Sequence, residues 1–495
     1  MKTFTRRGLL DLILVGTAAC VLATEVLPGE APPAAKKNVL FIAVDDLRPQ
    51  LGCYGKRQVL SPNIDKLAAR GTLFEHAYCQ QAVCSPSRTS LLTGCRPDTT
   101  KVYDLETHFR KTIPDVVTLP QYFKKHGYHT QGFSKIYHGG LDDAESWSVP
   151  HWQPKGPQYQ LKENMQLIRK RIAELPDEDA KVKAARRSSI RGMPFECADV
   201  ADNAYADGAT ADEAIRVLRD VKDKPFFLAV GFLKPHLPFV APRKYWDLYK
   251  REDIPLADNP YPPKDSPKIA WSNWAELRAY EGMPRTGSLG DDQARELIHG
   301  YLACVSYTDA QVGRVLDELD RAGLRDNTII VLWGDHGWKL GEHGMWCKHT
   351  NYELDANAPL ILSAPGQKAA GRKTSGLVEF VDIYPTLCEL AGLPRPEHLE
   401  GASFAPLLDD PEKPWKKAAF SQYPRGKVMG YTMRTDRYRF TRWQNPDGSA
   451  LAAELYDHQK DPKENVNIAG LPENAKLVED LTAQLKAGWR AAKPQ

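Results

Sequence analysis

The chain has 495 residues, of which 42% are hydrophobic and 26% are charged, and its formal net charge is +3. This composition is that of a globular protein, and the length is sufficient for a large α/β domain with a smaller companion. The charge is spread along the chain without a sustained basic run or an aromatic-basic repeat, which argues against a nucleic-acid partner.

Residues 1–35 are predicted to be an export signal followed by a linker. Arg6 and Arg7 precede a short apolar stretch and then small residues, an order typical of a secretory signal on the twin-arginine route. A membrane anchor is the weaker alternative, because the stretch is shorter than about 18 residues and contains Asp11. Lipidation of Cys20 is a further alternative. We therefore expect a periplasmic or extracellular protein without a transmembrane segment in its mature part.

Four apolar runs of strand length come next, separated by helical patterns such as residues 309–319. They lie at residues 38–44, 130–133, 226–232 and 328–333. Runs without polar alternation are typical of strands covered on both faces. Strands that alternate with helices predict an α/β fold: a large, mostly parallel central sheet flanked by helices, with sites at the carboxyl ends of the strands.

Two other segments are distinctive before the chain changes character near residue 418. Residues 162–191 are rich in Lys, Arg, Glu and Ala, and we expect a solvated helical insertion there, with a polyanion-binding face as the less favoured alternative. Residues 259–268 contain four prolines, which predicts a loop. Strand patterns at 420–423, 428–434 and 438–443 then precede a helical pattern at 472–493. We predict a main domain over residues 36–415 and a smaller antiparallel sheet with a helix over residues 416–495.

The most informative motif begins at Cys84. Residues 84–94 read Cys-Ser-Pro-Ser-Arg-Thr-Ser-Leu-Leu-Thr-Gly. Cys-x-Pro-x-Arg followed by Leu-Thr-Gly resembles the signature by which sulfatases mark the cysteine that is oxidised to formylglycine. A thiol is a poor nucleophile for sulfate ester cleavage, because the covalent adduct between the thiol and sulfate would not readily release the sulfate. In an aldehyde hydrate, one hydroxyl attacks sulfur and the second, once deprotonated, expels sulfate as the aldehyde re-forms. A helical pattern over residues 87–92 places Cys84 near helix N-terminal amides, which favour an anion.

Acidic residues follow two of the apolar runs. Asp45 and Asp46 follow the first run, and Asp335 and His336 follow the fourth. Either site alone favours a structural role, since acidic residues at strand ends commonly cap the next helix. Together they predict a converging metal cleft. Oxygen ligands suit a hard divalent cation, calcium first, while the imidazole of His336 leaves a transition metal open.

Cations and histidines follow the strands as well. They are Lys135 and His138 after residues 130–133, Lys234 and His236 after residues 226–232, and Lys348 beyond residues 328–333. Fixed cations stabilise the charge that develops during sulfate ester cleavage, and a histidine can protonate the departing alkoxide. A lone lysine is usually solvated and a lone histidine is usually a satisfied core residue. Their shared position shortly after strands favours a catalytic role.

With these residues in place, the chain resembles the sulfatases of the alkaline phosphatase superfamily, and within them the iduronate 2-sulfatase branch. The segments that carry the resemblance to this branch are residues 44–49, 80–84, 96–100 and 421–425. The resemblance covers residues 38–154, 226–251 and 298–365 and returns in the C-terminal part. Residues 156–207 match poorly, and residues 366–374 and the C-terminal subdomain are shortened. We expect these regions to rim the cleft, so they leave the exact sugar and the preferred chain length open.

The resemblance also implies a set of ligands and groups that hold the hydrate. It implies one Ca²⁺ held by Asp45, Asp46, Asp335, His336 and the formylglycine made from Cys84. It further implies that Arg88 and His138 hold and polarise the hydrate.

Roles toward the substrate follow from the same resemblance. Lys135 and Lys348 are expected to neutralise the sulfate, and His236 to contact the sulfate and the leaving oxygen. Trp338 and Lys348 match positions implicated in recognising a sulfated uronate, whose carboxylate needs a cation.

We therefore expect a sulfatase catalytic domain that removes the 2-O-sulfate from a terminal iduronate or related uronate of a glycosaminoglycan-like polysaccharide. Its partners are then the sulfated oligosaccharide and a formylglycine-generating or sulfatase-maturating enzyme. The first alternative is a phosphodiester or phosphonate ester hydrolase that uses the same formylglycine and a divalent metal. The second is a non-enzymatic carbohydrate-binding protein with a decayed site, which is disfavoured because every expected catalytic position is filled.

Overall fold

The computed structural model describes Met1 and residues 36–176 and 190–494. The predicted signal, with Arg6, Arg7 and Cys20, lies outside the described residues. Residues 36–495 form one compact unit, and the eight cysteines described in it are free thiols. None of the helices in the described residues combines the length and the apolar character that a bilayer crossing needs.

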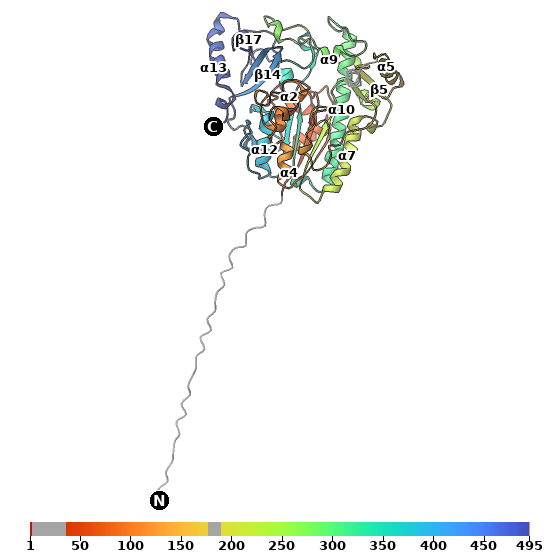
Figure 1. The fold of residues 1–495 in the computed structure, drawn as a ribbon, viewed down its shortest axis with the longest axis vertical. Helices are drawn as coiled ribbons and strands as arrows, with labels where there is room; N and C mark the ends of the chain where they lie inside the picture. The colour runs from red at the N-terminus through yellow and green to blue at the C-terminus, as the bar shows by residue number, and fades with distance from the viewer. Residues whose placement is uncertain (2–35, 177–189, 495) are drawn as a thin grey trace. The chain divides into compact units, whose positions relative to one another are not determined.

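A seven-stranded sheet forms the centre of the unit (Figure 1). Its strands, in spatial order, are β12 (Lys373–Thr374), β2 (Thr72–Phe74), β11 (Leu360–Ser363), β8 (Thr328–Gly334), β1 (Asn38–Val44), β6 (Phe226–Phe232) and β4 (His129–Ser134). β8, β1, β6 and β4 are parallel neighbours, whereas β11 is antiparallel to both of its neighbours. The predicted mostly parallel sheet is confirmed, and the four apolar runs are its four adjacent parallel strands.

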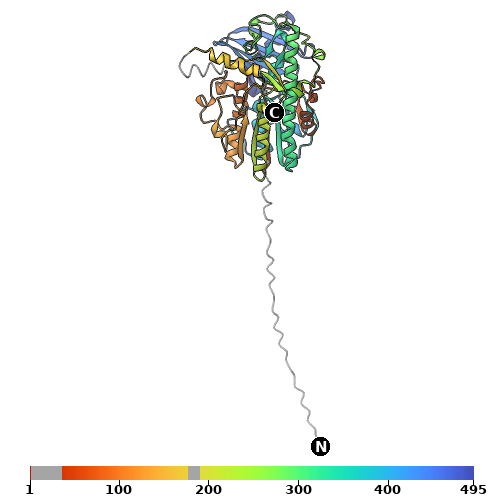
Figure 2. The same cartoon turned by 90° about the vertical axis from the view of Figure 1, so that its right-hand side faces the viewer.

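Two apolar cores cover the two faces of the sheet. Leu40 and Ile42 of β1 belong to one core, and Val39 and Phe41 belong to the other. This alternation explains why every residue of β1 is buried, since successive side chains of a strand point to opposite faces. The helices that supply the cores are α7 (Ala206–Val221) and α10 (Asp291–Arg321) for the first, and α2 (Cys84–Thr93), α4 (Leu119–Lys125) and α12 (Ile383–Leu390) for the second. Figure 2 shows α10 and α7 running alongside the sheet.

The C-terminal part contains a four-stranded antiparallel sheet with one helix. Its strands are β14 (Ala418–Arg425), β15 (Val428–Thr435), β16 (Tyr438–Gln444) and β17 (Ala450–Asp457). The helix α13 (Ala475–Ala491) buries Leu481 against Met433, Phe440 and Leu455 of this sheet. The predicted antiparallel sheet plus helix is confirmed. The domain boundary near residue 415 stays a prediction.

The other predicted segments differ in their outcome. α5 (Lys162–Ala173) is helical, while residues 177–189 of the same predicted insertion lie outside the described residues. The proline-rich segment contains no helix or strand until a 3₁₀-helix begins at Lys268. The remaining helices and strands are α1 (Pro62–Arg70), β3 (Ala77–Tyr78), α3 (Pro97–Thr100), β5 (Phe195–Ala198), β7 (Phe239–Pro242), α8 (Arg243–Trp246), α9 (Ala275–Arg278), β9 (Lys339–Leu340), β10 (Trp346–Cys347), α11 (Glu353–Ala356) and β13 (Val378–Glu379).

Candidate active site

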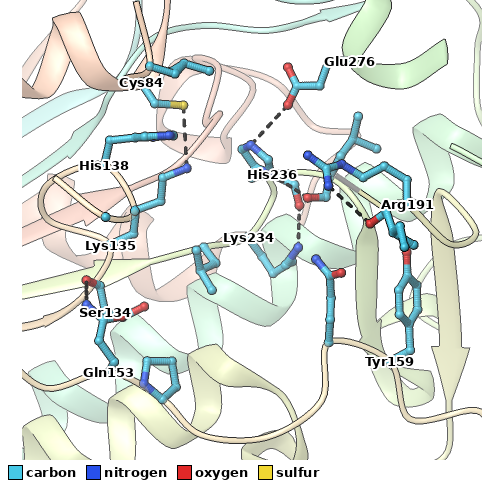
Figure 3. A pocket seen from close by; sticks show the side chains of 18 of the residues that line it. Cys84, Ser134, Lys135, His138, Gln153, Tyr159, Arg191, Lys234, His236 and Glu276 are labelled. Atoms are coloured by element: carbon cyan, nitrogen blue, oxygen red, sulfur yellow. Dashed lines mark hydrogen bonds and ion pairs between the residues drawn. The ribbon is translucent and has the colours of Figure 1, made fainter. Parts of the chain in front are cut away.

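The carboxyl ends of the four adjacent parallel strands carry the predicted site residues. Asp45 and Asp46 follow β1, Asp335 follows β8, Lys135 follows β4 and His236 lies beyond β6. Because parallel neighbours end at the same edge of a sheet, these residues come together. The edge opens into a cavity of about 870 Å³ lined by Cys84, Lys135, His138, His236 and Lys348, among others (Figure 3).

Cys84 is the first residue of α2, three residues earlier than the predicted helix start. Its Sγ lies 3.4 Å from Asp45 Oδ1, 3.4 Å from His336 Nε2 and 3.7 Å from Lys135 Nζ. Burial raises the pKa of the Cys84 thiol well above its usual value, and the charge of Asp45 adds to this effect. An unmodified thiol here is therefore protonated near neutral pH and is a poor nucleophile.

The predicted metal ligands form one buried cluster. Ligand atoms of Asp45, Cys84, Asp335 and His336 all lie within 4.8 Å of one another, and Asp46 joins Asp45 and Cys84 in an overlapping group. His336 Nδ1 lies 2.9 Å from the carbonyl oxygen of its neighbour at 337 and donates to it. The lone pair of Nε2 then faces Asp46 Oδ1 at 3.4 Å, as in histidine metal ligands whose other ring nitrogen is hydrogen-bonded. These donors fit a divalent cation.

The positive charge of Arg88 balances the carboxylates of Asp45 and Asp335. Its guanidinium, which is fully buried, donates to Asp335 Oδ2 at 2.9 Å and to Asp45 Oδ1 at 3.1 Å. The carbonyl oxygens of Lys135 and Ile136 accept its remaining hydrogen bonds. Arg88 is not among the residues that line the cavity, and it positions two of the carboxylates, while its direct role on the hydrate stays a prediction.

Two lysines balance the aspartates on the cavity side. Lys135 pairs with Asp45. Although burial raises the pKa of Asp45, the charges of Lys135, His236 and Arg88 outweigh it and hold that pKa well below its usual value. Burial raises the pKa of Asp46 to about 7, and the paired Lys348 opposes the rise.

Trp338 lies beneath Lys348 rather than on the cavity wall. The indole is 1% exposed, and the Lys348 ammonium lies 4.8 Å from the centre of its ring. This is the geometry of a cation–π contact. Trp338 therefore holds Lys348 in place, and a contact of Trp338 with the substrate stays a prediction.

Two of the histidines that line the cavity, His138 and His236, have different surroundings. Burial and the charge of Lys135 lower the pKa of His138 to about 3, so its ring is neutral at physiological pH. His236 has an acceptor at each ring nitrogen, because Nδ1 lies 2.6 Å from the carbonyl oxygen of Leu237 and Nε2 lies 3.2 Å from Glu276 Oε1. These acceptors favour a protonated ring, whereas burial together with Lys135 and Lys348 lowers the pKa of His236.

Several cavity residues were not found from the sequence. Glu276 on α9 contacts His236, and its carboxylate also lies 3.1 Å from Lys348 Nζ and 3.4 Å from His349 Nε2. Tyr159 and Arg191 line the wall that lies across from Cys84 in Figure 3. None of these residues follows an apolar run of strand length. Most of the other site residues were predicted because they follow such runs, so the same pattern could not identify these.

Comparisons with known proteins agree with this geometry. Residues 37–393 match the sulfatase family model, and residues 341–490 match the model described as the C-terminal part of N-sulphoglucosamine sulphohydrolase. The chain belongs to the sulfatase family. It is 36% identical to the iduronate 2-sulfatase of Mus musculus, over 95% of this chain and 97% of that protein. The chain is therefore a sulfuric ester hydrolase, and the non-enzymatic alternative is set aside.

Solved structures show how widely this fold is used. The phosphonate monoester hydrolase of Agrobacterium radiobacter superposes on this sulfatase with a TM-score of 0.72 at 24% identity, covering 91% of this chain and 95% of the other. A protein solved with its substrate D-glucosamine-2-N,6-O-disulfate gives a TM-score of 0.71 at 23% identity, covering 92% and 99%. These similarities confirm the predicted α/β architecture and carry no statement about substrate.

Proposed function

We propose that this sulfatase removes the 2-O-sulfate from a terminal iduronate or related uronate of a glycosaminoglycan-like polysaccharide, using a formylglycine made from Cys84. The observation that carries the proposal is the position of Cys84, which lines the cavity at the N-terminus of α2 and within 3.4 Å of Asp45 and His336. The 36% identity to an iduronate 2-sulfatase over almost the whole chain supports the choice of sugar.

Each group around residue 84 has a part in this proposal. Asp45, Asp46, Asp335, His336 and the modified residue 84 would hold one Ca²⁺. When bound, the cation supplies positive charge beside the ester oxygens. Lys135, with its ammonium 3.7 Å from Cys84 Sγ, is placed to neutralise the sulfate. His236 donates a proton to the leaving oxygen, and Glu276 favours the protonated ring that this step needs.

We further propose export by the twin-arginine route, which Arg6 and Arg7 support. That route carries folded proteins, whereas a maturating enzyme needs an unfolded segment around Cys84. Oxidation of Cys84 therefore precedes export. Exported enzyme with an unmodified thiol and full activity would contradict this order.

Mass spectrometry and a substrate panel test the main proposal. The tryptic peptide over residues 71–88 contains Cys84, and in active enzyme it should carry an aldehyde in place of the thiol. Purified enzyme should release sulfate from 2-O-sulfated uronate disaccharides, and Cys84→Ala should abolish the release. An unmodified peptide in fully active enzyme, or turnover confined to sugars sulfated elsewhere, would refute the proposal.

The second candidate is a phosphonate ester hydrolase that uses the same modified residue. The imidazole of His336 in the ligand set favours it, and the Agrobacterium enzyme is an example of a phosphonate monoester hydrolase with this fold. Sulfate and phosphonate monoesters of one aryl alcohol should be compared on enzyme whose bound metal has been assayed. Faster sulfate turnover with calcium supports the first proposal, and faster phosphonate turnover with a transition metal supports the second.

A further inference from the structure

The cavity extends well beyond the groups that surround Cys84. Its volume of about 870 Å³ lies near the upper end of the range of about 300–1,000 Å³ for small-molecule sites. The wall across from Cys84 is built by Tyr159, by one face of α5 and by the segment that begins at residue 190. The predicted solvated insertion is thus in part a wall of the active-site cavity.

The inner lysines are already engaged by carboxylates. Lys348 Nζ lies 2.9 and 3.1 Å from the two oxygens of Asp46 and 3.1 Å from Glu276 Oε2, and its side chain is 2% exposed. Lys135 pairs with Asp45 and lies beside Cys84. A sulfated uronate carries a carboxylate as well as the sulfate, and further positive charge on the cavity wall would complement this second anionic group.

Two arginines on the wall across from Cys84, Arg191 and Arg169, provide that charge. Figure 3 shows the Arg191 guanidinium pointing into the cavity from beside Tyr159, and Arg171 donates to the backbone carbonyl oxygen of Arg191 at 2.6 Å. Burial raises the pKa of the Tyr159 and Tyr280 hydroxyls, and the charge of Arg191 opposes the rise at both. Arg191 therefore lies close to both rings.

Arg169 adds a second guanidinium at the cavity rim. It is an exposed residue of α5 that lines the cavity, and no ion pair joins it to another described residue. The next residue, Lys170, is also exposed but is not part of the lining, and it lies 3.9 Å from Glu174. On the cavity lining near the rim, the carboxylate of Asp142 is already paired with His151 at 2.6 Å.

We propose that Arg191 and Arg169 form a second anion subsite, which binds an acidic group of the substrate other than the sulfate that is cleaved. The inference rests on the proposed function. Guanidinium groups bind carboxylate and sulfate alike through paired hydrogen bonds. The ligand is therefore the carboxylate of the terminal uronate or an acidic group on the next sugar. The predicted recognition of a uronate carboxylate by Trp338 and Lys348 stays a separate prediction beside this subsite.

Kinetics on three substrates test the subsite. They are 4-nitrophenyl sulfate, a 2-O-sulfated uronate monosaccharide, and the corresponding disaccharide with a sulfated second sugar. For Arg191→Ala, KM should rise about tenfold or more on a substrate whose second anion is bound, as expected for loss of a charged hydrogen bond, with a much smaller change in kcat. The rise should be several times smaller on 4-nitrophenyl sulfate. Arg169→Ala should show a weaker form of the same pattern, and Lys170→Ala, on the same helix, should match wild type.

The pattern across substrates identifies the source of the anion. A rise in KM on the monosaccharide assigns the carboxylate, and a rise only on the disaccharide assigns the next sugar. Equal losses on all three substrates, or no loss in either arginine variant, would overturn the subsite. Thermal melting of each variant separates these results from misfolding.

A binding measurement keeps this test independent of the proposed function. Calorimetry on Cys84→Ala should show that adding Arg191→Ala weakens disaccharide binding about tenfold or more, and equal binding would overturn the subsite. Wild-type enzyme that turns over 4-nitrophenyl sulfate but no sulfated uronate would contradict the proposed function instead.

Discussion

Glu276 connects three side chains of the cavity wall. Its carboxylate lies within 3.4 Å of His236 Nε2, Lys348 Nζ and His349 Nε2, and it is 20% exposed. Lys348 and the carboxylates beside it are buried, so the geometry of this group depends on its charge balance. Glu276 is therefore a positioning residue for both Lys348 and His236.

Replacement of Glu276 by Gln tests this role. The amide keeps the size of the side chain but removes the charge that holds Lys348 and favours the protonated ring of His236. We expect kcat to fall about tenfold or more, the scale of a charged hydrogen bond, while KM and the melting temperature change little. Glu252→Gln, at an exposed position outside the cavity lining, is the control. A kcat equal to that of wild type would show that Glu276 is only a wall residue.

The sequence predicts site residues wherever a local pattern marks them. Asp45 and Asp335 follow buried strands, and Cys84 lies in a contiguous motif, so the sequence could bring all three to one place, and their side chains do lie in one cluster. Glu276 and Arg191 lie in segments without a regular apolar period, and only tertiary packing brings them to the cavity. The buried surroundings of Arg88 and Trp338 could not be predicted, because a motif gives the identity of a residue but not the direction of its side chain.

At the scale of elements, β6 positions Lys135 through a glycine. Gly231 pairs with Ser134 of β4, and the chain turns directly after this pair, where Ser134 has a φ of 57°. A Cβ at residue 231 would lie 2.3 Å from the carbonyl oxygen of Lys135 and 2.4 Å from its carbonyl carbon. The backbone of Lys135 can approach β6 this closely only because residue 231 has no side chain.

Gly231→Ala should therefore displace Lys135. We expect a loss of about 1–3 kcal/mol in the free energy of unfolding, the usual cost of overpacking, and a fall in kcat/KM. Urea denaturation and kinetics on one preparation measure both. Gly470→Ala, where an added Cβ meets no atom within 4 Å, should leave both quantities near wild type. Unchanged activity in Gly231→Ala would mean that the position of Lys135 tolerates the shift.

Glu454 on β17 is a buried carboxylate outside the active site. Trp443 Nε1 donates to it at 2.9 Å, and the hydroxyls of Tyr456 and Tyr352 donate at 2.8 and 3.1 Å. Burial nevertheless raises its pKa from 4.5 to about 7. Between these two values the folded state holds a proton that the unfolded state has lost.

This difference predicts how stability depends on pH. When the pKa of a carboxyl group is higher in the folded state than in the unfolded state, the free energy of unfolding falls as pH rises between the two values. For Glu454 the fall is up to about 3 kcal/mol between about pH 4.5 and about pH 7. Glu454→Gln removes this pH-dependent contribution to the free energy of unfolding. Whatever stability the variant loses at pH 5, its free energy of unfolding relative to that of wild type should rise between pH 5 and pH 8. Urea denaturation at both pH values measures the change, with the exposed Glu473→Gln as control. Parallel pH profiles for wild type and Glu454→Gln would contradict the raised pKa.

Elements were predicted best where burial is uniform. The four apolar runs became β1, β4, β6 and β8 with shifts of at most one residue at an end. α10 spans Asp291–Arg321 rather than residues 309–319, because nearly all of its residues beyond 296 are buried and the apolar period that marks a surface helix is lost. β17 was missed, since the first half of the strand is largely exposed.

At the scale of the whole molecule, the C-terminal sheet is joined to the α/β part through buried contacts. Arg439 of β16 pairs with Glu353 and lies 2.7 Å from Glu464, and its side chain is 1% exposed. Tyr423 of β14 donates to or accepts from His349 Nδ1 at 2.8 Å, which connects the sheet to the cavity wall. Trp443 belongs to the same apolar core as β1 and α10. These contacts indicate that the sheet beyond residue 415 depends on the α/β part for its stability.

Cooperative unfolding is the consequence that can be measured. We expect one thermal transition in which secondary structure, tertiary signal and activity are lost together. Arg439→Met removes the buried cation that Glu353 and Glu464 share and leaves them only Arg434 and His458 as basic partners, so it should cost up to about 3–5 kcal/mol and lower the midpoint of that single transition. Arg437→Met, which removes a partly exposed pair with Asp457, should cost much less, because exposed ion pairs contribute little to stability. A separate low-temperature transition in Arg439→Met, with activity retained after it, would show instead that the predicted boundary near 415 separates two independent domains.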